Sequence, residues 1–260
     1  MSAGKSEDKR KSPGGATEIL VQQFRRDCIL SPLPGLARKT PRFPGLAPWA
    51  KIYRASGAVM LIESSRRAAM RIIAGIYRGR VLKTLRGQAV RPTGERLRES
   101  LFDVLGNSIQ GAVFVDCYAG SGAVGLEALS RGAGQVFLIE EDAAAQRLIE
   151  RNLAALGSPG LESGGNAVLV CASARRGLRR MEEQGVRARF CFLDPPYENS
   201  RERERSLRWL SASQLIEPGG QIIVQHDRKD APGASLGPWQ RARVLVQGSN
   251  ALSFYSRARN

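Results

Sequence analysis

Short apolar runs alternate with segments of helical periodicity from residue 112 onward. The apolar runs predict strands at Ala112–Cys117, Val136–Glu140, Val168–Cys171, Phe190–Leu193 and Gln221–Gln225. The segments between them predict helices at Val124–Arg131, Ala143–Leu156, Arg175–Glu183 and Arg203–Leu210. Strands that are apolar throughout and separated by helices are typical of a parallel sheet covered on both faces. The sequence therefore predicts an α/β fold.

The two ends of this pattern differ from its middle. Val244–Val246 and Ala251–Tyr255 flank Gly248-Ser249-Asn250 and predict an antiparallel hairpin at the end of the sheet. Before the pattern, Arg71–Gly75 and Gly79–Leu82 are expected to pair as two short strands. Thr93 is the expected N-cap of a helix that continues to Leu105.

Residues 1–69 carry Pro-Gly punctuation, and no helical or strand period persists in them. We interpret this segment as a mostly disordered extension. One alternative is a non-native upstream segment, with Met60 or Met70 as the true start, and another is an Arg-rich organelle transit peptide. Residues 70–260 are expected to form the folded domain, with a basic module at 70–110 and a core at 111–260.

The chain holds 40 Lys and Arg against 24 Asp and Glu, a net charge of +16. Such an excess suits a polyanion, either nucleic acid or an anionic membrane surface, although a solubilising surface would give the same count. No run approaches the ~20 apolar residues of a membrane span, so a soluble protein is expected.

The cysteines and the one histidine argue against a metal site. None of the four cysteines forms a CxxC pair, and His226 stands alone. Cys117, Cys171 and Cys191 lie in or at the end of apolar runs and are typical of buried thiols in a reducing compartment, which predicts a cytoplasmic protein.

A glycine-rich turn follows the strand that ends near Asp116. Gly120, Gly122 and Gly125 have the spacing G-x-G-x-x-G, which lets the backbone turn tightly and approach a ligand. The spacing alone also fits a nicotinamide dinucleotide. A carboxylate at Asp116 would repel a pyrophosphate, so it favours a ligand with an ammonium group, such as S-adenosylmethionine. Tyr118 and Ala119 belong to the same turn and are expected to contact this cofactor.

Two further strand ends offer polar groups to a nucleoside. Glu140 can accept hydrogen bonds from both ribose hydroxyls, a role that a dinucleotide enzyme would share; the alternative is a solvated charge. Ser173 can bond the adenine amino group, and a helix N-cap is the alternative there.

The sequence Asp194-Pro195-Pro196-Tyr197 follows an apolar strand, at the carboxyl end where open α/β sheets bind ligands. The Asp194 carboxylate and the Pro195 carbonyl offer two acceptors without a competing donor. Pro196 stiffens the loop, and Tyr197 can stack on a base turned out of its helix. A surface turn is the alternative, since Asp-Pro and Pro-Pro are common turn formers. The position after a complete glycine turn favours catalysis.

Two acceptors at this position suit the methylation of an exocyclic amine. The lone pair of such an amine is delocalised into the ring, and hydrogen bonds from its two hydrogens favour the pyramidal, nucleophilic geometry. The proton would leave through Asp194, and no metal is needed.

These residues resemble the RsmD family, bacterial methyltransferases that form N2-methylguanine in small-subunit (16S) ribosomal RNA. The resemblance covers residues 70–260 and is carried by Met70–Gly75, Arg78–Arg80, Arg91–Phe102, Asp116–Gly132 and Asp194–Tyr197. It implies the Rossmann-like fold of class I S-adenosylmethionine-dependent methyltransferases. It further implies S-adenosyl-L-methionine as cofactor and ribosomal RNA as substrate, in an assembled or assembling 30S subunit, with a monomeric enzyme. Glu95, Tyr118 and Ser173 depart from the family, where aspartate, phenylalanine and an acid or amide are common.

The basic module fits RNA independently of the resemblance, because guanidinium groups suit bidentate contact with phosphate. The expected RNA-binding residues are Arg71, Arg78, Arg80, Arg91, Arg96 and Arg98. The alternative is that Arg96 and Arg98 pair with Glu95 and Glu99 or lie in solvent.

Three other functions stay open at this point. An adenine-N6 methyltransferase acting on RNA or DNA would carry the same Asp-Pro-Pro-Tyr motif, although no separate DNA-recognition domain is visible. A non-catalytic ribosome-assembly protein is the second, and the intact Asp116, Glu140 and Asp194 argue against it. A nicotinamide dehydrogenase is the third.

Overall fold

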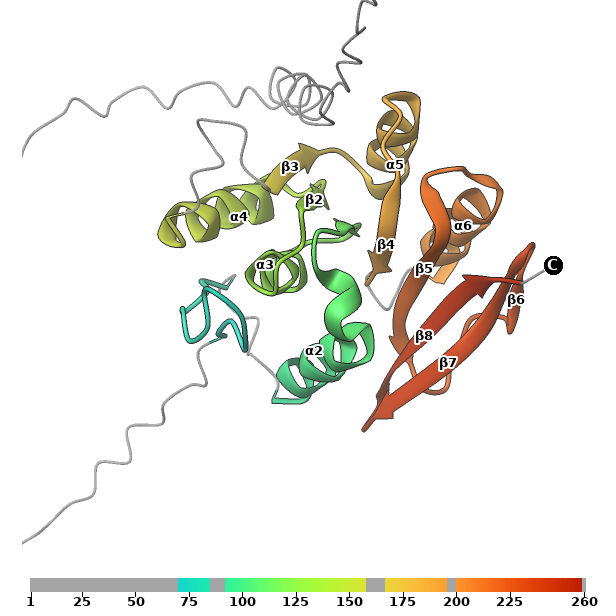
Figure 1. The fold of residues 1–260 in the computed structure, drawn as a ribbon, viewed down its shortest axis with the longest axis horizontal. Coiled ribbons are helices and arrows are strands. Elements are labelled where there is room, and N and C mark those ends of the chain that lie inside the picture. Colours follow the sequence, from blue (N-terminus) through green and yellow to red (C-terminus); the bar gives the residue numbers. More distant parts are fainter. Residues whose placement is uncertain (1–69, 85–91, 158–166, 196–199, 259–260) are drawn as a thin grey trace, which may run out of the picture. The chain divides into compact units, whose positions relative to one another are not determined.

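The computed structural model describes residues 70–84, 92–157, 167–195 and 200–258 (Figure 1). The segment 1–69 lies outside this range, so all three interpretations of it stay predictions. Arg91, Pro196 and Tyr197 also lie outside the described residues. None of the described helices is both long and apolar enough to cross a bilayer.

The strands form one eight-stranded sheet in the order β3-β2-β1-β4-β5-β8-β7-β6. Neighbours from β3 to β5 run parallel, and β8, β7 and β6 add to them antiparallel. The bounds are Val113–Asp116 (β1), Gln135–Glu140 (β2), Ala167–Cys171 (β3), Ala188–Leu193 (β4), Ile216–Asp227 (β5), Ser235–Leu236 (β6), Trp239–Gln247 (β7) and Asn250–Arg257 (β8). The predicted α/β fold, with a mainly parallel sheet and a C-terminal hairpin, is confirmed. The two-residue strand β6 was not predicted.

Helices cover both faces of the sheet (Figure 1). Successive residues of a strand point to opposite faces, so Phe114 of β1 packs with α2, α3 and α4, whereas Val115 packs with α5 and α6. The bounds are Pro92–Leu105 (α2), Ala123–Ser130 (α3), Ala143–Ala155 (α4), Ala174–Glu183 (α5) and Ser200–Ala212 (α6), with a 3-10 turn at Gly106–Ile109.

The beginning of the basic module differs from the prediction. The two expected strands reduce to a single antiparallel bridge between Arg71 and Val81. Backbone hydrogen bonds from the Ile72 amide to the Arg80 carbonyl and from the Leu82 amide to the Met70 carbonyl still join the two segments, and Gly75 and Gly79, with φ of +82° and +81°, lie in the turn between them. The helix α2 begins at Pro92, one residue before the predicted N-cap Thr93.

Buried polar side chains of α3 and α4 hold residues 70–84 against the domain. Glu127 accepts hydrogen bonds from the backbone amides of Ile73 (2.8 Å) and Ala74 (3.0 Å). Asn152 accepts from the amide of Lys83 and donates to its carbonyl. The segment is therefore fixed against the domain at both of its ends.

Candidate active site

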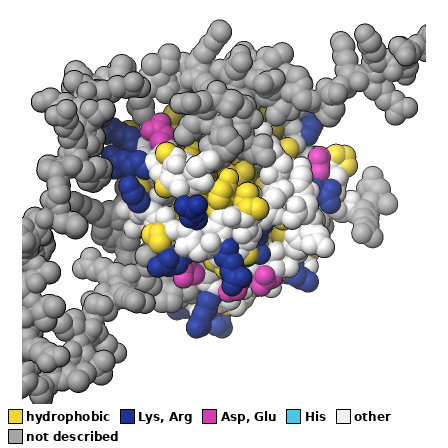
Figure 2. All heavy atoms as spheres, turned by 60° about the vertical axis from the view of Figure 1, so that its left-hand side comes forward, with side chains coloured by type: hydrophobic (Ala, Val, Ile, Leu, Met, Phe, Trp, Pro, Cys, Tyr) yellow, Lys and Arg dark blue, Asp and Glu magenta, His cyan; other side chains and the backbone are white. Residues whose placement is uncertain are grey.

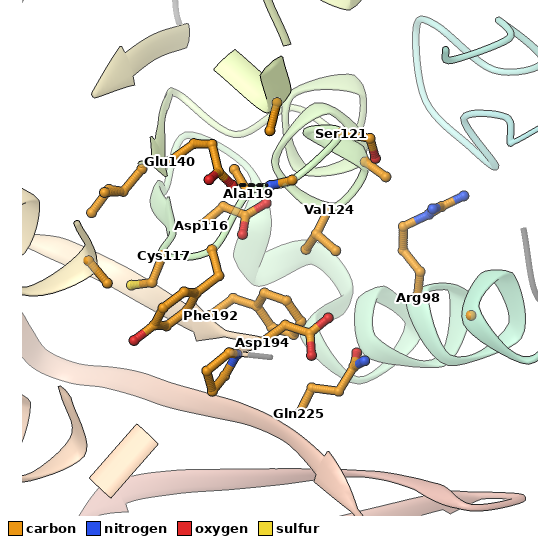
Figure 3. Close-up of a pocket in the computed structure, with 18 of the residues that line it drawn as sticks. Arg98, Asp116, Cys117, Ala119, Ser121, Val124, Glu140, Phe192, Asp194 and Gln225 are labelled. Atoms are coloured by element: carbon orange, nitrogen blue, oxygen red, sulfur yellow. Dashed lines mark hydrogen bonds between the residues drawn. The ribbon is translucent and has the colours of Figure 1, made fainter. Parts of the chain in front are cut away.

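A cavity of about 930 Å³ lies at the carboxyl ends of the parallel strands (Figure 3). Asp116 of β1, Glu140 of β2 and Gln225 of β5 line it, together with Asp194, which directly follows β4. The strand order reverses between β1 and β4, and ligands of open α/β sheets bind at such a reversal. The sequence-predicted acids are thus brought together in one cavity.

Asp116 presents a buried acceptor to this cavity. Its Oδ2 accepts a hydrogen bond of 3.0 Å from the Gly125 amide, whereas Oδ1 is buried and has no partner within the described ranges. Burial raises the pKa of Asp116 to about 7, and the nearby charges of Asp194 and Glu140 raise it further against the Gly125 hydrogen bond. A cation that reached Oδ1 would satisfy this orphaned atom and favour the carboxylate form.

The glycine turn between β1 and α3 needs its glycines for two reasons. Gly120 and Gly122 have φ of +55° and +80°, which other residues rarely adopt. A Cβ at Gly125 would lie 2.4 Å from Leu138 Cδ2, so this glycine lets α3 pack closely on β2. Tyr118, Ala119 and Gly120 line the cavity, whereas Gly122 precedes α3 without lining it.

Glu140 fixes the position of the glycine turn. Its Oε2 accepts from the Gly120 amide at 2.8 Å, and its Oε1 accepts from the amides of Glu141 and Asp142. The side chain is therefore held in the cavity wall, and the alternative of a solvated charge is wrong. A carboxylate has about four lone-pair positions, so acceptor capacity remains for a ligand hydroxyl.

Asp194 and Gln225 line the cavity from the ends of neighbouring strands, since Leu193 of β4 pairs with Val224 of β5 (Figure 3). Asp194 is half-buried, and the loss of water around its carboxylate raises its pKa to about 7. Pro195 is buried next to it and also lines the cavity. Sequence reasoning missed Gln225, although it is the polar residue that ends the predicted strand Gln221–Gln225. Its amide offers both a donor and an acceptor.

Two of the predicted contacts are placed differently. Ser173 lines a second pocket, and its neighbours Ala172 and Ala174 line the main cavity instead. Arg98 was expected among exposed arginines, but it is buried and donates from Nη2 to the Arg71 carbonyl at 2.6 Å. Its Nε also lies 3.8 Å from Glu127 Oε2. Arg98 lines the main cavity but is only 5% exposed, and its bond to the Arg71 carbonyl and its pairing with the buried Glu127 argue against the phosphate contact that we expected (Figure 3).

The other described arginines of the basic module are exposed: Arg71, Arg78, Arg80 and Arg96. Figure 2 shows the side of the molecule that carries α4 and residues 70–84, where Lys and Arg side chains lie at several places, some of them beside Asp or Glu side chains. This surface leaves guanidinium groups accessible to solvent.

The family described as Conserved hypothetical protein 95 matches residues 70–256. The chain is 34% identical to Ribosomal RNA small subunit methyltransferase D of Escherichia coli K12, over 72% of this chain and 90% of that protein. It is 34% identical to the protein of the same name from Haemophilus influenzae, over 73% and 94%. The solved structure of yhhF from Escherichia coli, described as a candidate methyltransferase, superposes with a TM-score of 0.62 at 32% identity, covering 73% of this chain and 98% of that one. The chain therefore belongs to the family of Conserved hypothetical protein 95, and its resemblance to RsmD is confirmed by relatives named ribosomal RNA small subunit methyltransferase D.

Proposed function

We propose that this protein transfers a methyl group from S-adenosyl-L-methionine to the exocyclic N2 amine of a guanine in small-subunit (16S) ribosomal RNA. The observation that carries the proposal is the convergence of Asp116, Glu140 and Asp194 on one cavity of about 930 Å³. That volume suits a ligand and a base together, since pockets for drug-sized ligands are about 300–1,000 Å³. The names of the relatives support the RNA substrate.

The residues around the glycine turn fit this cofactor. The orphaned Oδ1 of Asp116 suits the ammonium of the methionine part, and the remaining lone pairs of Glu140 suit the ribose hydroxyls. Gly120 leaves open space where a side chain would stand, because a Cβ there would meet nothing within 4 Å. When bound, the cofactor supplies an electrophilic methyl group on a positively charged sulfur.

Asp194 and Pro195 would position the amine of the substrate base. Both residues line the cavity next to Phe192, and they provide a carboxylate and a carbonyl as acceptors. With a pKa of about 7, Asp194 is ionised in a large fraction of molecules at neutral pH. It can therefore accept the proton that the amine loses and then release it to water.

The exposed arginines Arg71, Arg78, Arg80 and Arg96 would hold RNA phosphates beside the cavity. We propose that the substrate is the RNA of an assembled or assembling 30S subunit. The protein would then work as a monomer in the cytoplasm, where that subunit is built.

One experiment tests the proposal against its alternatives. The protein is incubated with radiolabelled S-adenosylmethionine and either protein-free 16S RNA or small subunits from an unmodified strain, and the labelled nucleoside is identified. We expect N2-methylguanosine, formed much more slowly by the Asp194→Ala control. N6-methyladenosine would instead establish the adenine enzyme. Tight binding to subunits without any label would establish an assembly protein.

A further inference from the structure

A second pocket of about 360 Å³ lies between the first turn of α5 and the helix α6. These two helices pack against each other on the sheet face opposite to the basic module (Figure 1). Arg175, Arg176 and Arg179 of α5 line the pocket, with Trp209 of α6 across from them. Neither the glycine turn nor the Asp-Pro-Pro-Tyr motif accounts for these residues.

The three arginines are free to bind a ligand. All three are exposed, and within the described ranges none of their guanidinium groups has an ion-pair partner. Exposed arginines that line one pocket suit an anion with several oxygens, because each guanidinium presents a planar fork of donors.

The start of α5 points to the same kind of ligand. The first amides of a helix have no intrahelical acceptor, and the Ser173 side chain makes no capping hydrogen bond to them. Ser173, Ala174, Arg175 and Arg176 line the pocket, so the first turn of α5 forms part of its wall. A helix of ten residues adds a partial positive charge there. Helix terminus and guanidinium groups therefore favour the same anion.

Trp209 adds a surface for stacking. It is half-buried against the core of α5 and α6, and part of its ring faces the pocket. Aromatic rings next to guanidinium groups are typical of sites that hold single-stranded nucleic acid, where bases stack while phosphates bind to cations.

The second pocket adjoins the main cavity. Tyr118, Glu141, Ala174 and Glu202 line both, and the two acids lie on this shared side. The proposed cofactor carries no phosphate and bears a positively charged sulfur, so the three guanidinium groups of this pocket would not strengthen its binding. The proposed substrate is a polyanion and would pass over the mouth of the cavity.

We infer that the pocket of Arg175, Arg176, Arg179 and Trp209 binds a phosphate and the adjoining base of the RNA strand, one or a few nucleotides from the target base. This rests on the proposed RNA substrate. The exposed arginines of the basic module and those of α5 lie on opposite faces of the sheet, so the strand is held on both sides of the cavity.

Binding without methylation tests the inference separately from the reaction. The affinity of the full chain for a short fluorescent single-stranded RNA is measured against salt concentration, for wild type and Arg175→Gln/Arg179→Gln. We expect the variant to bind roughly 5- to 50-fold more weakly. Its salt slope should be less negative by about 0.7 for each phosphate that the variant no longer neutralises. Calorimetry with S-adenosylhomocysteine should give unchanged affinity.

The matched control is Arg187→Gln/Arg189→Gln. Arg187 directly precedes β4 and Arg189 lies in its first residues, at the end of the strand away from the cavity; Arg189 makes a partly exposed ion pair with Glu217 at 3.4 Å, and removing both arginines changes the net charge equally. Equal RNA affinity and salt slope for the two double variants would overturn the inference. A loss of S-adenosylhomocysteine binding in the α5 variant would assign the pocket to the cofactor instead. Reduced RNA binding without any methylated nucleoside would keep the inference and reject the proposed reaction.

Discussion

The Oε2 atom of Glu127 accepts a hydrogen bond of 2.8 Å from the backbone amide of Ile73, across 54 positions of the sequence. The same carboxylate accepts from Arg131 Nε at 2.8 Å, and its side chain is fully buried. Met70, three residues before Ile73, lines the main cavity. A structural acid of α3 thus positions one wall of the proposed active site without touching a ligand.

Replacement of Glu127 by Gln should destabilise the protein strongly. The amide would turn a donor toward backbone amides or guanidinium groups that are themselves donors, and Arg98 would lose its buried counter-charge. Removing one partner of a buried ion pair costs about 3–5 kcal/mol. The change is measured as the free energy of unfolding in urea, with the exposed Glu183→Gln as control. Equal free energies of unfolding for the two variants would show that Glu127 does not hold the basic module against α3.

Gly75→Ala and Gly79→Ala form a matched pair. Both glycines have φ near +80°, so alanine carries a similar backbone strain of about 1–2 kcal/mol at each. A Cβ at Gly75 would lie 1.8 Å from the Ser130 carbonyl oxygen, whereas one at Gly79 would meet nothing within 4 Å. We expect Gly75→Ala to lower the thermal midpoint clearly more than Gly79→Ala. Equal midpoints would show that residues 70–84 do not pack on α3 as described.

Asp116→Ala should weaken binding of S-adenosylmethionine. The variant removes the buried Oδ1 that we assign to the ammonium group, and a hydrogen bond to a charged group contributes about 1.5–3 kcal/mol. Calorimetry measures the change, and Gln110→Ala, an exposed residue outside the cavity, is the control. Unchanged affinity would remove Asp116 from the cofactor site.

Asp116→Asn should stabilise the free protein above neutral pH. The folded state keeps the Asp116 proton up to a pH of about 7, whereas the unfolded chain loses it near pH 4. The contribution of Asp116 to the stability of the wild type therefore falls as the pH rises from about 4 to about 7 and stays constant above that range. Asparagine avoids the buried charge, and since one pKa unit corresponds to about 1.4 kcal/mol, its advantage at high pH is on the order of 2–4 kcal/mol.

The measurement is the thermal midpoint of both proteins across this pH range without cofactor. The difference should shrink toward zero as the pH falls to about 4–5, where aspartic acid and asparagine are both neutral. A difference that does not vary with pH would show that Asp116 is ionised at all of these pH values.

Asp194→Ala should slow methyl transfer by ~10²–10⁴-fold while cofactor binding survives, because Asp116 and Glu140 stay in place. Asp194→Asn separates the two roles of the carboxylate. An amide oxygen still accepts a hydrogen bond but takes up no proton. If Asp194→Asn is nearly as active as the wild type, the main role of Asp194 is to align the amine. If Asp194→Asn is as slow as Asp194→Ala, its main role is to remove the proton. A single-turnover rate for Asp194→Ala equal to that of the wild type would show that the Asp-Pro-Pro-Tyr motif is a structural turn without a catalytic role.

The sequence predicted the sheet and its cavity well because the relevant signals are local. An apolar run followed by Asp116 and three glycines predicts a strand, a tight turn and a ligand-binding site within a few residues. Each helix of the core agrees with its prediction within a few residues, since apolar periodicity and tertiary packing favour the same state there. Asp194 and Glu140 were found because strand ends of a parallel sheet meet at one edge.

The basic module was predicted less well because its structure depends on distant partners. Arg98 lies three and four residues before Leu101 and Phe102 on the buried face of α2, so helical spacing could have indicated its burial, whereas its pairing with the distant Glu127 of α3 could not be read from the sequence. The two predicted strands pair over a single bridge, Arg71 with Val81, because the amides of Ile73 and Ala74 just beyond it bind the Glu127 side chain instead. Gln225 could have been found by asking which polar residue ends each predicted strand.

The placement of β8 between β5 and β7 has a consequence for synthesis on the ribosome. β8 follows every other described element in the chain, yet it completes the middle of the sheet and contacts α2. Domains emerge from their amino end at about 5–20 residues per second, so α2 waits roughly 7–30 s for this packing surface. A nascent chain that stalls before Asn250 would leave β5 with an open edge, to which other chains can pair.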